Sequence, residues 1–263
     1  MTDSAPPATP DERYSVYELP ELYDLLFEGL VFDVPYWTRV AREAQGPVLE
    51  LTCGTGRVLL RLLEAGVDAD GTDLNAPMLD RLRDKARAGG FASALVQADM
   101  TSFAMPRRYA RVLCPFNGFA HAESAEAQIA TLVRCREHLL PGGALVLHMT
   151  YPGVAYWSEP DGEPVLEHEV TLPGSGHTLQ LWDLRFRDRI AQRQRSEMEI
   201  RERDASGRTV ASHRVHASQR WVYRAELELL FRLAEFSRFA VHGGFEHEPL
   251  ERDNQQMIAW AWR

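Results

Sequence analysis

The sequence predicts an α/β domain with a doubly wound, mostly parallel sheet, followed by an antiparallel β insertion. Between residues 46 and 150, short apolar runs alternate with helical patterns, as strands and crossover helices do in a parallel sheet. After Tyr151 the pattern changes to partial two-residue alternation, which indicates antiparallel strands with one wet face. The stretch from Gly46 to Leu60 combines a buried strand, a glycine turn and a helix start, so it is expected to position a ligand.

Length and composition narrow the class of protein. A chain of 263 residues with 45% hydrophobic residues suits one large domain with an elaboration. The formal net charge of −9 argues against a nucleic-acid partner, which needs a basic surface. Cys53, Cys114 and Cys135 show neither metal spacing nor a disulfide framework, so we expect no metal and a reducing, cytoplasmic location. No apolar run approaches the roughly 20 residues of a membrane span, so no membrane partner is expected.

Local signals place each element of the core. The first strand is an apolar run after Pro47, and the second strand ends in Asp73. Gly66 is expected to end the first crossover helix, and Pro141 to end the last one before the insertion. The expected strands are 48–51, 67–73, 94–99, 110–116 and 144–149, and the expected helices are 56–65, 77–88 and 125–140.

The flanking regions are expected to add a cap and a lid. Two aromatic-rich helices, 18–27 and 35–44, precede the first strand; they could cover the core or face the ligand, and the sequence leaves both open. The insertion shows alternation over 178–187, 197–201 and 210–223, and the last elements are a helix at 224–234 and strands at 236–245 and 257–262. The expected parts are a disordered tail (1–13), a helical cap (14–45), a ligand-binding core (46–150), an antiparallel lid (151–223) and the last elements of the core (224–263).

Two ligands suit the glycine turn, a dinucleotide and S-adenosylmethionine (SAM). The dinucleotide fingerprint needs a third glycine three residues after Gly56, where this chain has Leu59. SAM carries no pyrophosphate; it needs the close turn, an acid for the ribose hydroxyls and contacts for adenine. Asp73 and Asp99 follow at the ends of the second and third strands, with Phe116 and Asn117 after the fourth, and this order favours SAM.

The combined motifs resemble those of class I SAM-dependent methyltransferases. The matching segments are Glu50–Gly56, Gly71–Asp73 with Asn75–Leu79, Gln97–Met100 and Leu140–Gly143. The resemblance covers about residues 14–149 and implies a Rossmann-like, seven-stranded sheet with an antiparallel last strand. It departs from the family at Thr52, where glycine is usual, so the turn is expected to be wider or more strained. The expected cofactor-binding residues are Tyr23, Glu50, Thr52, Gly54, Gly56, Asp73, Leu74, Met78, Asp99, Met100, Phe116 and Asn117.

A looser similarity points to a subgroup. The early pair Tyr23-Asp24 and the insertion before Arg224 are similar to glycine and amino-sugar N-methyltransferases. This similarity implies that the insertion covers the acceptor pocket and that Tyr23 or Tyr14 reaches the SAM carboxylate. Aromatic side chains could line that pocket or fill an ordinary core. The expected substrate-binding residues are Tyr14, Tyr17, Trp157, Trp182 and Trp221.

Methyl transfer from a sulfonium is an in-line displacement with a neutral leaving group, so alignment of the reactants is the main requirement. A base is needed only where the acceptor must lose a proton early. His121, beyond the fourth strand, is the candidate catalytic base, and its alternative role is a surface or capping histidine. His148 is expected to be a core histidine, and at most one of His213 and His216 is expected to face the pocket.

These observations predict a SAM-dependent methyltransferase that acts on nitrogen, oxygen or an aromatic carbon of a small molecule, in specialised-metabolite biosynthesis. An RNA or protein methyltransferase is the alternative that a basic cleft beside the glycine turn would favour. A non-catalytic SAM-binding regulatory module is the alternative that a closed pocket would favour. A homodimer is one assembly that the chain could form.

Overall fold

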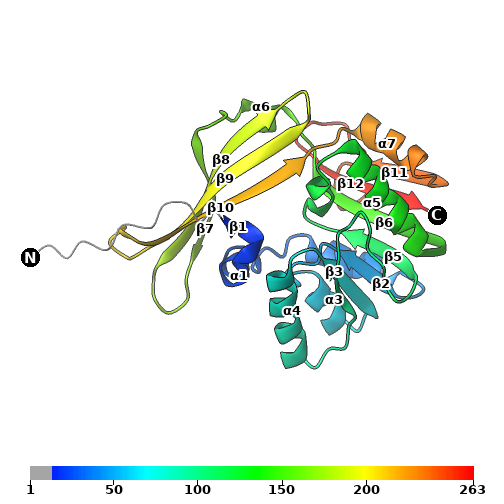
Figure 1. Cartoon of the computed structure of the whole chain (residues 1–263), viewed down its shortest axis with the longest axis horizontal. Coiled ribbons are helices and arrows are strands. Elements are labelled where there is room, and N and C mark those ends of the chain that lie inside the picture. Colours follow the sequence, from blue (N-terminus) through cyan, green and yellow to red (C-terminus); the bar gives the residue numbers. More distant parts are fainter. Residues whose placement is uncertain (1–13) are drawn as a thin grey trace, which may run out of the picture.

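The computed structural model describes residues 14–263, apart from the side chains of Tyr14 and Ala155. The disordered tail expected at 1–13 lies outside the described residues. Two sheets dominate the structure: a seven-stranded sheet, and a five-stranded sheet beyond one end of its strands, with α1 between the two (Figure 1). We call the five-stranded sheet, made of β1 and β7 to β10, the lid sheet.

The seven-stranded sheet confirms the expected fold class. The strand order is β11-β12-β6-β5-β2-β3-β4, and the strands from β6 to β4 are parallel. The last strand in sequence, β12, pairs antiparallel with both of its neighbours, as the family resemblance implied. The bounds are β2 (Val48–Leu51), β3 (Ala69–Asp73), β4 (Leu95–Gln97), β5 (Tyr109–Cys114), β6 (Leu139–Thr150), β11 (Arg238–His242) and β12 (Gln256–Trp262).

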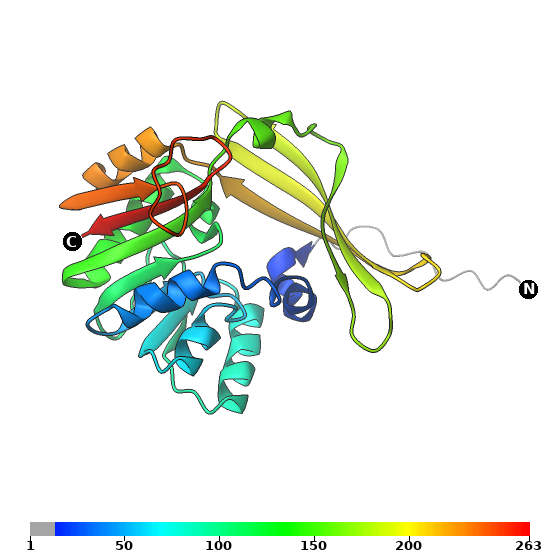
Figure 2. The same ribbon diagram turned by 180° about the vertical axis from the view of Figure 1, so that it is seen from behind.

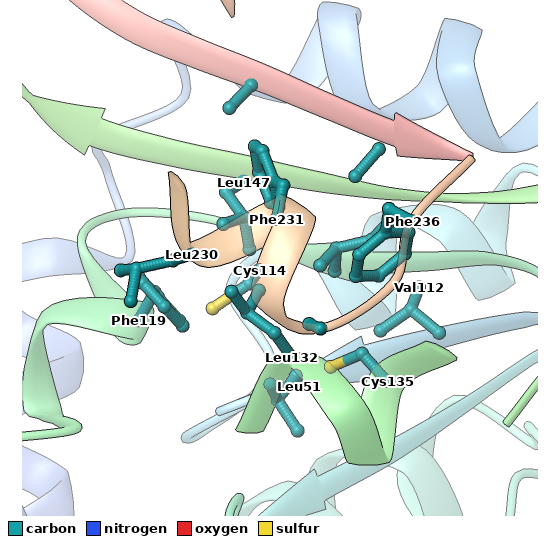
Figure 3. Packing of buried hydrophobic residues seen from close by; sticks show 14 of the residues in the cluster. Leu51, Val112, Cys114, Phe119, Leu132, Cys135, Leu147, Leu230, Phe231 and Phe236 are labelled. Atoms are coloured by element: carbon teal, nitrogen blue, oxygen red, sulfur yellow. The ribbon is translucent and has the colours of Figure 1, made fainter. Parts of the chain in front are cut away.

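Helices cover both faces of this sheet, so the central strands are apolar on both sides. Trp37, Leu59 and Leu82 pack on one face, from helices that lie together in front of the sheet in Figure 2. Leu132 and Phe231 pack on the other face with Leu147 (Figure 3). The first group is α2 (Val34–Arg42), α3 (Leu59–Glu64) and α4 (Ala76–Ala88), and the second is α5 (Ala125–His138) and α7 (Arg224–Leu233).

The lid sheet is the expected antiparallel meander with two further strands, β1 and β7. β7 to β10 pair antiparallel in chain order, and β1 pairs parallel with the outer edge of β10. The turn expected at 204–207 joins β9 to β10, where the Gly207 N–H donates to the Asp204 carbonyl at 2.8 Å. The bounds are β1 (Tyr14–Ser15), β7 (Pro164–Thr171), β8 (Thr178–Asp188), β9 (Arg193–Arg203) and β10 (Thr209–Arg220).

The two N-terminal helices divide the two roles that the sequence left open. α2 buries Tyr36 and Trp37 in the core, and the Trp260 indole N–H donates to the Tyr36 hydroxyl at 3.0 Å. α1 (Pro20–Phe27), after the short helix η1 (Val16–Glu18), packs instead beneath the lid sheet, where Leu26 is buried beside Leu181. α2 therefore covers the core, and α1 joins the core to the lid sheet.

Several bounds differ from the sequence-based expectations. α3 begins at Leu59 rather than residue 56, because the glycine turn continues to Val58. β6 begins at Leu139, so Pro141 lies within a strand rather than before one. The strands β1 and β7 and the helix α6 (Val154–Ser158) were not among the expected elements; β1 forms by pairing with residues 215 and 216, a contact that local sequence does not encode.

The described residues contain no helix that is long and apolar enough to cross a membrane. Within the same residues, no group of three or more His, Cys, Asp or Glu side chains could hold a metal ion. Cys53, Cys114 and Cys135 are all buried and free.

Candidate active site

The glycine turn between β2 and α3 has one open glycine and one packed glycine. Gly54 has φ +53°, and no heavy atom lies within 4 Å of the place where a Cβ would stand. Gly56 has φ +90°, but a Cβ there would lie 2.3 Å from Leu82 Cδ1 of α4. Gly54 therefore leaves space for a ligand beside the backbone, whereas Gly56 allows helix and turn to pack closely. The expectation that Gly56 contacts the cofactor has no support in this geometry.

Leu59 also has a clear packing role. A Cβ on Gly71 of β3 would lie 2.8 Å from both Leu59 Cδ2 and Cys53 Sγ. In a dinucleotide site, a third glycine in the helix lets the helix and the strand pack closely. Here a glycine in the neighbouring strand, Gly71, has that role.

Thr52 carries the strain that its departure from glycine predicted. Its φ is +56°, in the left-handed region that β-branched residues rarely adopt. Its hydroxyl donates to the Leu51 carbonyl at 2.6 Å. A Cβ on Gly118 would lie 2.0 Å from Thr52 Oγ1, so the small residue at 118 makes room for the threonine.

A cavity of about 520 Å³ lies above this turn, and we call it the glycine-turn cavity. Ends of β2, β3 and β5, the segment after β4, α1 and part of β10 line it. Of the expected cofactor-binding residues, Gly56 and Asn117 do not line it, and all the others do. Asn117 faces the adjoining cavities instead, and its side-chain carbonyl accepts the Thr150 N–H at 2.6 Å.

Two carboxylates at strand ends are oriented by backbone N–H groups. Asp73 accepts the Gly54 N–H at 2.8 Å and the Asn75 N–H at 2.9 Å. Asp99 Oδ1 accepts the N–H and the hydroxyl of Thr101, each at 2.7 Å, and no described residue bonds to Asp99 Oδ2. Both carboxylates line the cavity and retain acceptor capacity for a ligand.

Glu50 is a third carboxylate of the cavity, and it is buried. Its side chain is 3% exposed, and Oε2 has no hydrogen-bond partner among the described residues. Burial raises the pKa of Glu50 well above its usual value. A ligand cation would satisfy this oxygen and offset the cost of burying the charge.

His121 and Tyr17 form a hydrogen-bonded pair at the wall of the cavity. His121 Nδ1 lies 3.0 Å from the Ser218 carbonyl oxygen, which can only accept, so Nδ1 carries the ring proton. His121 Nε2 lies 2.8 Å from the Tyr17 hydroxyl oxygen and accepts a hydrogen bond from that hydroxyl. Burial lowers the pKa of His121 and raises the pKa of Tyr17 well above its usual value, so both groups are neutral at pH 7.

Arg57 is a site residue that the sequence analysis missed. Its guanidinium lines the cavity, forms two hydrogen bonds with Asp33 at 2.5 and 2.8 Å, and lies 4.7 Å from the Phe116 ring centroid. Burial alone would raise the pKa of Asp33, but the Arg57 hydrogen bonds outweigh burial and lower it. The position directly after Gly56 was the available signal, because a charge there must be paired to be buried.

The structure separates the expected aromatic residues. Tyr17 and Tyr23 line the glycine-turn cavity, whereas Trp182 lies on the opposite face of the lid sheet, 5.2 Å from the Arg201 guanidinium carbon. Trp157 and Trp221 pack together near α6 with ring centroids 5.0 Å apart, and Trp221 lines a separate cavity. The Tyr14 side chain lies outside the described residues. The expectation that Trp157 and Trp182 contact the acceptor has no support in this placement.

The histidines behave as the local pattern suggested. His148 is 2% exposed, its Nε2 bonds to Gln256 at 2.8 Å, and its Nδ1 accepts the Phe116 N–H at 3.2 Å. His216 lines the glycine-turn cavity, and His213, three residues earlier on the same strand, does not.

Comparisons with known proteins relate this chain to methyltransferases. Residues 48–143 match the model of a methyltransferase domain. The chain is 29% identical over 245 residues to the cypemycin N-terminal methyltransferase of a Streptomyces species, covering 90% of this chain and 93% of that protein. The structure of the CcbJ methyltransferase from Streptomyces caelestis aligns with a TM-score of 0.74 and 25% identity, covering 94% of this chain and 97% of that one. These findings support a class I SAM-dependent methyltransferase: a methyltransferase domain spans residues 48–143, and the fold resembles that of the CcbJ structure.

A further relative is the dTDP-3-amino-3,6-dideoxy-alpha-D-glucopyranose N,N-dimethyltransferase of Streptomyces fradiae. It is 30% identical to this methyltransferase over 154 residues, or 56% of this chain. The chain spans 58% of the length of that relative in the match.

The cavity of this methyltransferase fits SAM on its own geometry. Gly54 leaves open space where a side chain would otherwise stand, and the unpartnered Glu50 oxygen is a site for a cation. Asp73 and Asp99 offer acceptors at successive strand ends, where open α/β sheets bind ligands. The residues present therefore suit the ammonium, ribose and adenine groups of the cofactor.

Proposed function

We propose that this methyltransferase methylates an amino group of a small molecule in the biosynthesis of a specialised metabolite. The observation that carries the proposal is the Tyr17–His121 pair, which lies on a wall shared by the glycine-turn cavity and the adjoining cavity under the lid sheet. The relatives support nitrogen as the acceptor atom, because the Streptomyces fradiae enzyme is an N,N-dimethyltransferase of an amino sugar and the cypemycin enzyme is an N-terminal methyltransferase.

We assign the cofactor contacts to residues of the glycine-turn cavity. Asp73 would accept hydrogen bonds from the ribose hydroxyls, and Asp99 Oδ2 from the adenine amino group. Glu50 would pair with the ammonium, and Tyr23, beside Arg57, would approach the carboxylate. The remaining wall residues of the proposed site are Thr52, Gly54, Leu74, Met78, Met100 and Phe116.

SAM, when bound, supplies a methyl group on a sulfonium that leaves as a neutral thioether. The protein must hold the acceptor amine in line and keep its lone pair available. A protonated amine would transfer its proton to the Tyr17 oxygen while the Tyr17 proton moves to His121 Nε2. The Ser218 carbonyl accepts a hydrogen bond from the Nδ1–H group and would stabilise the imidazolium that forms. His121 would thus act through Tyr17 rather than directly on the acceptor.

An acceptor screen with methyl-labelled SAM tests the proposal. Mass spectrometry of matched amines, alcohols and phenols should show the label on nitrogen. Label on oxygen or on an aromatic carbon would change the acceptor atom, and label only on RNA or protein would favour the alternative substrate classes. SAM binding without transfer to any acceptor would support a non-catalytic module. The cytoplasmic location, the homodimer and the absence of nucleic-acid and membrane partners stay predictions.

A further inference from the structure

Two further cavities continue from the Tyr17–His121 pair. The first chamber, of about 350 Å³, lies under the lid sheet and shares Tyr17, Phe116 and His121 with the glycine-turn cavity. The second chamber, of about 430 Å³, lies near α6 and is lined by Tyr156 and Trp221. The two chambers have five lining residues in common, Asn117, Glu167, Arg185, Gln194 and Gln219, so they adjoin. An acceptor held at Tyr17 would lie at the first chamber, and the second chamber lies across the five shared residues.

Arg185 lines both chambers, and its charge is already neutralised. The guanidinium Nε donates to Asp183 at 2.9 Å, and the two terminal nitrogens pair with Glu159 and Glu167. The Arg185 side chain is 14% exposed, so three carboxylates surround one buried cation. A phosphate or carboxylate of a ligand would have to displace one of them.

The other basic groups near the chambers are also engaged. Arg220, which lines the second chamber, pairs with Glu226 at 2.6 Å and donates to Gln128. His168, in the first chamber, stacks on Phe27 with ring planes 9° apart. Among the described residues that line these chambers, every arginine therefore has a carboxylate partner, and a buried anion would lack a counter-charge.

On the outer face of the lid sheet, a third and more open cavity contains Arg193 and Arg195. Those arginines pair with Glu123 and Glu197. This cavity therefore offers no unpaired arginine to a phosphate either.

Two buried polar atoms of the chambers lack partners and would be satisfied by hydrogen-bonding groups of a ligand. Asp183 is 4% exposed; its Oδ2 accepts from Arg185 and Ser196, and its Oδ1 has no partner among the described residues. Trp221 is 8% exposed, and its indole N–H has no partner there either. One acceptor and one donor, with the carboxamides of Gln194 and Gln219 between the chambers, suit hydroxyl, amine or amide groups.

We propose that the acceptor is a two-part amine without phosphate: an amino sugar linked to an uncharged second group, with the sugar in the first chamber and the second group against Trp221. This proposal rests on the proposed function and narrows its substrate class. It separates this methyltransferase from an enzyme whose substrate is a nucleotide-linked sugar, since a pyrophosphate would meet only paired arginines.

Calorimetry on the full chain loaded with S-adenosylhomocysteine tests the proposal with three probes. The probes are the methyl and the phenyl glycosides of 3-amino-3-deoxyglucose, and dTDP. The phenyl glycoside should bind about tenfold tighter than the methyl glycoside, because its ring can pack on Trp221. dTDP should show no binding at about 1 mM. Equal affinities of the two glycosides, absence of binding by both, or dTDP binding tighter than the phenyl glycoside would each overturn the proposal.

Variants sharpen the test. Glu167→Gln with Asp183→Asn should leave Arg185 with Glu159 as its one carboxylate partner among the described residues and raise the affinity for inorganic pyrophosphate about tenfold or more. The matched control is Glu199→Gln, which frees Arg201 on the opposite face of the same sheet and should give no gain. A gain equal to that of the control contradicts the charge argument. Should the double variant not fold, the ranking of the three probes on the unaltered chain still decides.

The two proposals fail in different ways. Failure of the chain to bind S-adenosylhomocysteine, or to methylate any amine in the labelled screen, contradicts the proposed function. Correct cofactor binding and amine methylation with the wrong order of probe affinities contradicts only the two-part, phosphate-free acceptor.

Discussion

The proposed cofactor side and the proposed acceptor side of the site are built in different ways. The cofactor side uses the ends of neighbouring strands, where Glu50, Asp73 and Asp99 follow one another along the chain. The acceptor side brings together Tyr17, His121 and Ser218, which lie 104 and 97 positions apart in the two hydrogen bonds that join them. The cofactor side is thus set by short motifs on one sheet, whereas the acceptor side depends on where the lid sheet and α1 meet the core.

The largest expected effect tests the acceptor side. His121→Ala should lower kcat by about 10²–10⁴-fold if the base is essential. Because burial lowers the pKa of His121 below 6.5, the neutral base predominates at pH 7 and is lost as the pH falls through that lowered pKa. The wild-type kcat should therefore decline on the acid side, and the variant should lack this decline.

Tyr17→Phe is the matched variant, since it keeps the ring and removes the hydroxyl that bonds to His121. It should lose the same acid-side dependence as His121→Ala. Unchanged rates in both variants would mean that alignment alone suffices, and His121 would then be a structural residue.

The next effect concerns the packing that supports the cofactor side. In the wild type the Arg57 side chain is 9% exposed and the Asp33 side chain is 0% exposed. Arg57→Ala leaves the buried Asp33 carboxylate without its cation. Breaking such a pair should cost about 3–5 kcal/mol in the free energy of unfolding, measured by urea denaturation. Arg61→Ala breaks the exposed pair with Glu64 and should cost less than about 1 kcal/mol. Similar losses in both variants would show that the Arg57–Asp33 pair is not a supporting contact.

A moderate effect is expected for cofactor affinity. Asp73→Ala should weaken SAM binding by about 1.5–3 kcal/mol, or roughly 10- to 150-fold, because charged hydrogen bonds are lost and the Gly54 N–H loses its acceptor. Titration calorimetry with SAM measures the change. Trp182→Ala, on the outer face of the lid sheet, should leave both SAM affinity and turnover unchanged. Unchanged affinity in Asp73→Ala would refute the assignment of the cofactor side.

The smallest effect concerns the strained turn. Thr52→Gly should stabilise the protein by about 1 kcal/mol, since left-handed strain of about 1–3 kcal/mol is relieved and glycine flexibility costs up to about 1 kcal/mol. Gly118→Ala should destabilise the wild type through its clash with Thr52 Oγ1, and less so in the Thr52→Gly background. Equal losses in the two backgrounds, measured by urea unfolding, would contradict the coupling.

Particular residues show which features of the site local sequence could predict. Asp73 and Asp99 were predictable because parallel strands end at one edge and short loops follow each strand. The cofactor contact of Gly56 stays a prediction, because a glycine in a turn can serve a ligand or a neighbouring helix, and the position of Leu82 accounts for the helix packing. The acceptor contact of Trp182 has no support in its position on the outer face, because alternation defines two faces of a strand without saying which one the core covers.

The sequence by itself determined the class of fold, the cofactor and the strand ends that form its site, because periodicity and short motifs are properties of neighbouring residues. Only the tertiary structure decided that the Tyr17 hydroxyl bonds to His121, that Arg57 is buried against Asp33 and that Arg185 is surrounded by carboxylates. These contacts join segments distant in the chain, and the packing of the lid sheet against α1 and the core brings them together. The set of side chains that would contact the acceptor is therefore a property of that packing.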